Sequence, residues 1–265
     1  MSLRLQVSLN GARSATDGAV VPLSPHEVVE SARGAVAAGA GEVLVHPRTP
    51  CGRESLSPRV VGPLLEALRG AGVSVPLSVC ASIGAEPDPA GRLERVRSWT
   101  VLPDRAAVHF AEPGAEDLAQ ALLARGVAVD AVLPAGAEDA AGPGAEPLAR
   151  FLARPAGESA RVRLVVAPAV ADPALVAGLR WLAPVPLLLF GRGAAAWPVL
   201  RLAARCGAAA RIGAGDVLHL PDGRPARSNA ELVAAAVETA SEAAAEGEGE
   251  TAATAAAAAA TAWSR

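Results

Sequence analysis

Residues 42–56 read EVLVHPRTPCGRESL and join a short apolar run to a polar loop that contains glycine. Side chains alternate between the two faces of a β-strand, so Leu44 and His46 would share one face. Pro47 cannot continue a central strand, so the strand should end there. The Ser-Pro pair at 57–58 has the residue types of a helix N-cap and of the first helical position. The stretch therefore predicts a strand, a polar loop that starts at His46, and a helix.

The same strand–loop–helix plan recurs along the chain. We expect strands at residues 3–9, 43–46, 75–80, 105–110, 127–133, 161–166, 186–190 and 209–212. We expect helices at residues 24–38, 57–69, 88–99, 115–124 and 146–153, one starting at 172, one ending at 205, and a last one at 228–245. Alternating units with short connections predict an α/β fold, a closed (β/α)8 or TIM barrel. An open doubly wound sheet is the alternative, because apolar periodicity does not reveal closure.

The predicted domain organisation is a single barrel over residues 1–245 with a C-terminal tail at 246–265. The tail is rich in Ala and Thr and has too few large apolar side chains to build a core. We therefore expect a low-complexity appendage and no second domain.

Composition excludes several classes of protein. Hydrophobic residues make up 51% of the 265 residues, yet no apolar run approaches the ~18 residues of a membrane span. The first residues lack the apolar region of a signal peptide, so we expect a cytoplasmic protein. Three cysteines in widely spaced positions do not suggest a disulfide framework. A net charge of −3 with scattered arginines argues against nucleic-acid binding.

The chain contains no lysine, because all 24 basic residues are arginine. Schiff-base aldolases and enzymes with covalently held pyridoxal phosphate both need a lysine amine. Both classes are therefore excluded.

In α/β barrels the working residues lie at the C-terminal ends of the strands and in the loops that follow. This rule selects Asn10, Arg13, His46, Arg48, Cys80, Ser82, His109, Glu112, Asp130, Arg192, Arg211 and Asp216. The pair Arg211 and Asp216 flanks two glycines and could position a ligand, or it could be an ion pair that braces the rim. The segment Gly191–Gly193 could bind an anion or serve only as a turn. Cys80 has no base beside it in sequence, which favours a small buried apolar role.

Several motifs together resemble the β-keto acid cleavage enzymes, the family of 3-keto-5-aminohexanoate cleavage enzyme. The motifs are SLNGAR at 8–13, VHPR and GRESL within 45–56, VAVD at 127–130, RIGAGDVLHLPDGRPA at 211–226 and SNAELV at 228–233. The resemblance implies a zinc-dependent barrel that cleaves β-keto acids with acetyl-CoA as cosubstrate, giving acetoacetate and a new CoA thioester. Its partners would be a small keto acid and a CoA thioester, and we expect a homo-oligomer.

The family's zinc ligands are only partly present in this sequence. Its second strand ends in His-x-His-x-Arg-Asp, and the matching residues here are Leu44, His46, Arg48 and Thr49. The family's third ligand is a Glu that precedes the Asp of the eighth-strand motif, and Gly215 stands there. His46 is thus the one retained metal position of three, and zinc should be weak or absent because a catalytic zinc normally needs three protein ligands.

Other matching positions carry the predicted roles in this chain. Asp216 and Arg211 match the family's catalytic carboxylate and arginine, and Asp130 stands where the family usually has Glu. We assign catalysis to Asp216, Arg211 and Asp130, and substrate binding to Arg48, Asn10, Cys80, Ser82 and Arg192.

Three hypotheses follow from the incomplete zinc site. The protein could cleave keto acids through Arg211, Asp216 and other arginines in place of zinc. It could instead be a degenerate barrel that binds a carboxylate, a CoA-like ligand or a paralogous partner without turnover. In the third hypothesis the metal has moved to a site formed by His46, Cys80, His109 and Asp130, which would end four consecutive strands.

Overall fold

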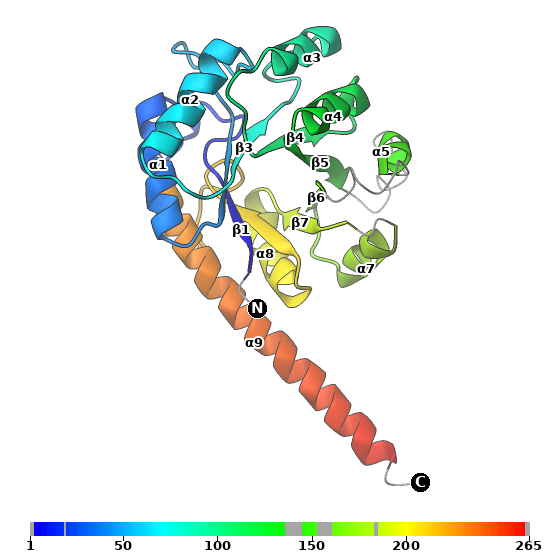
Figure 1. The fold of residues 1–265 in the computed structure, drawn as a ribbon. Helices are drawn as coiled ribbons and strands as arrows, with labels where there is room; N and C mark the ends of the chain where they lie inside the picture. Colours follow the sequence, from blue (N-terminus) through cyan, green and yellow to red (C-terminus); the bar gives the residue numbers. More distant parts are fainter. Residues whose placement is uncertain (1–2, 19, 136–144, 153–160, 183–184, 263–265) are drawn as a thin grey trace.

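Eight parallel strands close into a barrel in chain order, so the predicted (β/α)8 fold is confirmed and the open sheet is not formed (Figure 1). The computed structural model describes residues 3–18, 20–135, 145–152, 161–182 and 185–262. The strands are β1 (Leu5–Ser8), β2 (Glu42–Val45), β3 (Leu77–Cys80), β4 (Arg105–His109), β5 (Ala128–Ala135), β6 (Val162–Pro168), β7 (Leu187–Phe190) and β8 (Ala209–Ile212). β8 pairs with β1, with Val7 opposite Ile212, and this pairing closes the ring.

Helices surround the barrel as expected. They are α1 (Pro25–Ala37), α2 (Pro58–Gly70), α3 (Pro89–Arg97), α4 (Ala115–Ala124), α5 (Ala145–Leu152), α7 (Pro173–Leu182), α8 (Ala196–Arg205) and α9 (Asn229–Ala262), with short 3-10 turns η1 (Ala15–Asp17) and η3 (Gly193–Ala195). The helix expected at 146–153 is described to Leu152, and its last residue, Ala153, lies outside the described residues. No helix in the described ranges is both long and apolar enough to cross a lipid bilayer.

The helix starts follow the chemistry that the sequence suggested. Ser24 and Glu27 form a reciprocal capping box at α1, and Asp88 accepts the Gly91 N–H at α3. Ser57 precedes α2 but makes no side-chain capping hydrogen bond. Of the two residues expected to mark the start of this helix, only Pro58 in the first turn acts as predicted.

The final helix runs beyond its expected end at residue 245. α9 packs on α1 and α8 near its start, and Figure 1 shows its C-terminal part, in orange and red, projecting away from the barrel. The division into a barrel and a separate tail stays a prediction.

The barrel interior is apolar in the middle and polar at both ends. Its central layer packs the inward side chains Leu44, Cys80, Ala107, Val132, Val165, Leu188 and Phe190 against one another. We call the C-terminal end of the strands the upper end, where polar loops meet, and the N-terminal end the lower end. Because the middle is filled by side chains, chemistry at the two ends is separate.

Candidate active site at the upper end of the barrel

Arg211 and Asp216 form a buried bidentate ion pair at the upper end. Nε and one terminal nitrogen of Arg211 lie 3.0 and 2.9 Å from the two carboxylate oxygens of Asp216. Both residues are buried, and the Arg211 guanidinium stacks on Phe190, with its Cζ 3.3 Å from the ring centroid. Two parallel charge-assisted hydrogen bonds fix the carboxylate's orientation. The pairing predicted from the sequence is therefore present and rigidly held.

The loop after β8 is packed tightly against the loop after β1. A Cβ atom on Gly215 would lie 2.2 Å from the Ser8 Oγ and 2.8 Å from the Gly11 backbone nitrogen. Gly215 has no positive φ, so steric contact and not backbone conformation demands glycine there. The close approach brings Asp216 next to the residues that follow β1, where Arg13 donates to the Asp216 carbonyl oxygen.

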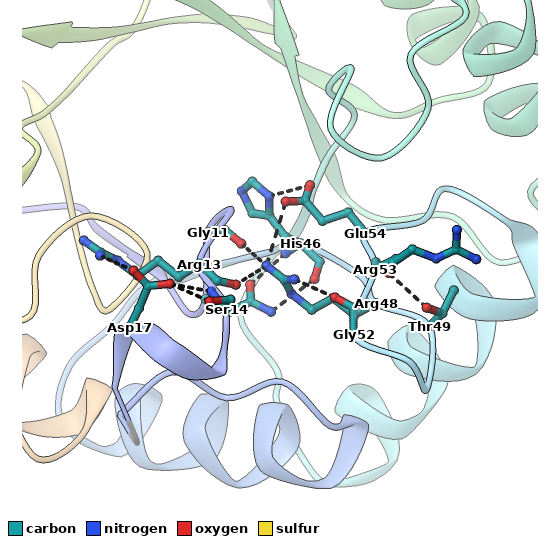
Figure 2. Close-up of polar contacts among 11 residues, drawn as sticks. Gly11, Arg13, Ser14, Asp17, His46, Arg48, Thr49, Gly52, Arg53 and Glu54 are labelled. Atoms are coloured by element: carbon teal, nitrogen blue, oxygen red, sulfur yellow. Dashed lines mark hydrogen bonds and ion pairs between the residues drawn. The ribbon is translucent and has the colours of Figure 1, made fainter.

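A second charged pair joins the ends of β2 and its loop. His46 Nδ1 lies 3.1 Å from Glu54 Oε2, and Figure 2 shows the two side chains facing each other. Asn10 fixes the His46 backbone, because its Oδ1 accepts the His46 N–H at 3.0 Å and its Nδ2 donates to the His46 carbonyl at 3.1 Å. Both polar ends of the Asn10 side chain are used in this way. Asn10 therefore positions His46, and its predicted contact with substrate stays a prediction.

Arg48 holds the surrounding loops together. Its guanidinium donates to the carbonyl oxygens of Gly52 and Gly11 at 2.8 Å and of Arg13 at 2.6 Å (Figure 2). One terminal nitrogen also lies 3.8 Å from Glu54, and the side chain is 7% exposed. Arg48 therefore supports the site, and its predicted role as a substrate ligand stays a prediction.

Cys80 lies between two imidazoles. It ends β3, and its Sγ is 3.9 Å from Nε2 of His109, which ends the adjacent β4. Burial raises the pKa of the Cys80 thiol, but the charges and hydrogen bonds of His46 and His109 outweigh burial and hold that pKa well below its usual range. The predicted convergence of these three residues is therefore present.

The pKa of His46 is raised in the same cluster. Burial disfavours the charged imidazolium, but Cys80 and Glu54 outweigh burial and raise the pKa from 6.5 to about 9. Burial likewise raises the pKa of Glu54, yet His46 and Arg48 reverse the effect and lower it. Near neutral pH, His46 is thus a cationic donor at the barrel's upper end.

Asp130 belongs to the lower end of the barrel, and its prediction as a strand-end catalytic residue is wrong. β5 continues five residues past Asp130 to Ala135. The carboxylate binds Arg105 at 2.6 Å and Arg163 at 2.9 Å, and Arg163 also binds Glu42 at 2.7 Å. These partners stand near the starts of their strands. Burial raises the Asp130 pKa, but Arg163 and Arg105 outweigh it and lower that pKa, as expected for a structural ion-pair network.

The remaining predicted site residues lie in the upper loops. Ser82 follows β3, and a Cβ on Gly84 would lie 3.3 Å from Glu54 and 3.5 Å from the Ser82 Oγ, so both side chains face this loop. Arg192 is exposed, with its Cζ 5.8 Å from the Phe190 centroid.

Two other polar groups at the upper end are already engaged. The Gly193 N–H donates to the Asp216 carbonyl at 3.0 Å, which favours the turn interpretation of Gly191–Gly193 over anion binding. Glu112 accepts the Ile83 N–H and lies 3.5 Å from Arg92, so it braces a loop.

The residues of this chain do not fit the family's zinc. Leu44 is 2% exposed inside the apolar central layer, and it has no donor atom. A Glu at 215 would collide with Ser8 and Gly11, as the Cβ distances show. The relocated site is not formed either, since in the described part of the chain no three His, Cys, Asp or Glu side chains are arranged to hold one metal ion. Asp130, its proposed fourth ligand, lies at the opposite end.

Glu54 belongs to the site's geometry but is not among the site residues predicted from the sequence. Glu54 lies in the GRESL motif. The loop folds back so that Arg48 and Glu54 pair in an isolated antiparallel β-bridge, and this brings the Glu54 side chain to His46. An acidic residue a few positions beyond a strand-ending histidine was the available signal.

Comparison with known proteins places most of the chain in one family. The family model of the β-keto acid cleavage enzymes matches residues 3–129 and 160–260. The chain belongs to the β-keto acid cleavage enzyme family. The family resemblance read from the sequence motifs is confirmed. No functionally curated protein matches the sequence significantly.

Solved structures share the barrel at low sequence identity. ObcA in its apo form matches with a TM-score of 0.61 and 16% identity, over 83% of this chain and 61% of ObcA. ObcA in complex with oxaloacetate matches with a TM-score of 0.60 and 15% identity, over 83% of this chain and 63% of that chain. The Escherichia coli homocysteine methyltransferase MmuM matches with a TM-score of 0.60 and 18% identity, over 91% of this chain and 96% of MmuM. These likenesses show the fold alone, and this chain spans about 61% of the length of ObcA.

Proposed function

We propose that this protein exchanges acyl groups between a β-keto acid and acetyl-CoA, giving acetoacetate and a new CoA thioester, without the family's zinc. The observation that carries the proposal is the buried Arg211–Asp216 pair at the upper end, in the positions of the family's catalytic arginine and carboxylate. Family membership supports the reaction class. ObcA, which shares the fold, has been solved with a C4-CoA adduct and oxalate, and this supports a CoA thioester as cosubstrate.

The reaction moves two acyl groups in opposite directions. The bond between the keto carbon and the methylene carbon of the β-keto acid breaks, and the methylene carbon bonds to the acetyl carbonyl carbon. The CoA sulfur leaves the acetyl group and bonds to the keto carbon. Atoms and electrons balance without an oxidant or a reductant.

Two groups of the site suit these steps. The methylene protons of a β-keto acid are acidic because two carbonyl groups flank them, and the Asp216 carboxylate would take one of them as a general base. His46, cationic near neutral pH and held by Glu54, would donate to the oxygen on which negative charge develops. Asp216 and His46 both lie at the upper end of the barrel.

A non-catalytic barrel that binds a CoA-like ligand is the second candidate. The observation that favours it is the replacement of two zinc ligands by Leu44 and Gly215, in surroundings that leave no room for a substitute carboxylate. Such a protein would bind acetyl-CoA and never release acetoacetate.

An assay of acetyl-CoA against a panel of β-keto acids separates the two candidates. The proposed enzyme forms acetoacetate and the matching CoA thioester in equal amounts, and only when both substrates are present. Saturable acetyl-CoA binding with no acetoacetate from any keto acid of the panel would favour the binder.

A further inference from the structure

Neighbouring strands bring a thiol, two imidazoles and a carboxylate together at the upper end. His46, Cys80 and His109 follow or end β2, β3 and β4, and these strands are hydrogen-bonded neighbours. The Cys80 Sγ lies 3.9 Å from His109 Nε2, and the His46 imidazole, 3.1 Å from Glu54, is a second polar neighbour of the thiol. A nucleophile beside a base, with a second group oriented by a carboxylate, is the general layout of covalent catalysis.

The surroundings suit a reactive thiol better than a structural one. Cys80 is a free cysteine that is itself only 2% exposed, and the partly exposed His46 and His109 lie between its thiol and solvent. Ser78, on the same inward face of β3, is 1% exposed and its Oγ has no hydrogen-bond partner within the described residues. A buried apolar cysteine would need neither imidazole beside it.

We infer that Cys80 is a covalent acyl carrier, whose sulfur takes the acetyl group from a CoA thioester before that group moves to the keto acid. The identity of the donor rests on the proposed function, whereas the nucleophilic role of the thiol rests on the cluster itself. Neither the Arg211–Asp216 pair nor the family's zinc takes part in this step.

The acylation is a thioester exchange. His109 holds the proton of the Cys80 thiol, the thiolate sulfur attacks the acetyl carbonyl carbon, and the oxygen's developing negative charge faces the His46 donor. The carbon–sulfur bond to CoA then breaks, and His109 returns the proton to the CoA sulfur. The products are S-acetyl-Cys80 and free CoA. The methylene carbanion of the keto acid later displaces the Cys80 sulfur, which regains its electron pair.

The test incubates the full-length protein with acetyl-CoA alone, and in parallel with a small acetyl thioester of N-acetylcysteamine. We expect one acetyl group per chain on Cys80 in peptide mass spectra, an equal amount of released thiol, and removal of the label by hydroxylamine. His109→Gln should slow labelling by about 100-fold or more, since a positioned base contributes that much.

Matched variants make the site assignment specific. Cys51→Ser and Cys206→Ser should label like the wild type, whereas Cys80→Ala should not label. Acetylation of Cys51 alone, or no label on Cys80 of the wild-type protein from either thioester, overturns the inference even if a Cys80 variant fails to fold. Labelling by the small thioester but not by acetyl-CoA supports the thiol role and contradicts CoA as the donor.

The two proposals fail separately. Acetyl-Cys80 without acetoacetate from any keto acid supports the acyl carrier and contradicts the proposed function. Undiminished acetoacetate formation by Cys80→Ala supports the proposed function and overturns the acyl carrier.

Discussion

Asp216 uses both carboxylate oxygens to bind Arg211, at 2.9 and 3.0 Å, although the two residues are only five positions apart. The turn between them can pack against the loop after β1 because Gly215 has no side chain that would collide with Ser8 and Gly11. The Arg211 guanidinium lies on Phe190, which is itself part of the apolar central layer. The result is a carboxylate with a single fixed orientation, which is what a positioned general base requires.

Asp216→Asn should therefore lower acetoacetate formation by about 100-fold or more, since the amide cannot accept the substrate proton. It should also lower the free energy of unfolding by about 3 kcal/mol, because Arg211 stays buried with its charge unmatched. The rate and the urea unfolding curve are measured at a temperature where the variant is folded. Asp222→Asn is the matched control, because Asp222 is an exposed Asp in the loop that follows, and that variant should keep the wild-type rate. A wild-type rate in Asp216→Asn would remove Asp216 from the reaction.

Asp130→Asn should affect stability and leave the chemistry of the upper end intact. Removing this charge leaves Arg105 and Arg163 without their shared partner, which costs about 3–5 kcal/mol. The Asp130 pKa is lowered in the fold, so its contribution is fully present above the ordinary value of 3.8 and declines as the pH falls through the lower, folded value. The stability difference from wild type, measured by urea unfolding, should thus be large near neutral pH and shrink in acid.

The control for Asp130 is Glu146→Gln, which removes an exposed ion pair with Arg150 and should change stability little. A stability difference that persists unchanged into strong acid would contradict the role given to the Asp130 charge.

His46 should titrate with a pKa near 9, above its ordinary 6.5, when its ring carbon signals are followed by NMR. Glu54→Gln removes one of the two negative partners of the imidazolium, so the midpoint should move down toward the ordinary value. A His46 midpoint that is the same with and without the Glu54 charge would rule out the ion pair in solution.

Leu44→His with Gly215→Glu restores the family's ligand types but should not restore stoichiometric zinc. The Glu side chain at 215 would displace Ser8 and the Gly11 backbone, and such overpacking typically costs about 1–3 kcal/mol. We expect a lower melting temperature and substoichiometric zinc by elemental analysis. One tightly bound zinc per chain at wild-type stability would show that the upper loops can still form the family's metal site.

The barrel and the Arg211–Asp216 pair could be predicted because they depend on local pattern. Strand and helix periods repeat along the chain, and this pair is close in sequence. The strand-end rule places Asp130 wrongly, because the apolar run and the predicted strand continue past this charge to Leu133. Its partners Arg105 and Arg163 come from adjacent strands, so only the register places Arg163 opposite Asp130.

The rest of the site depends on contacts that a sequence does not display. Strand order brings His109 to Cys80, which the strand-end rule did anticipate. The fold-back of one loop brings Glu54 to His46, and no periodicity reports that contact. The exclusion of a carboxylate at 215 depends on distances to Ser8 and Gly11 in another loop.

We propose that this member of the family exchanges acyl groups between a keto acid and acetyl-CoA without zinc. Bound zinc and acetoacetate formation should be measured on the same sample, before and after treatment with a strong chelator. We expect far less than one zinc per chain and a rate that the chelator leaves unchanged. A rate that disappears with chelation and returns in proportion to added zinc would contradict it.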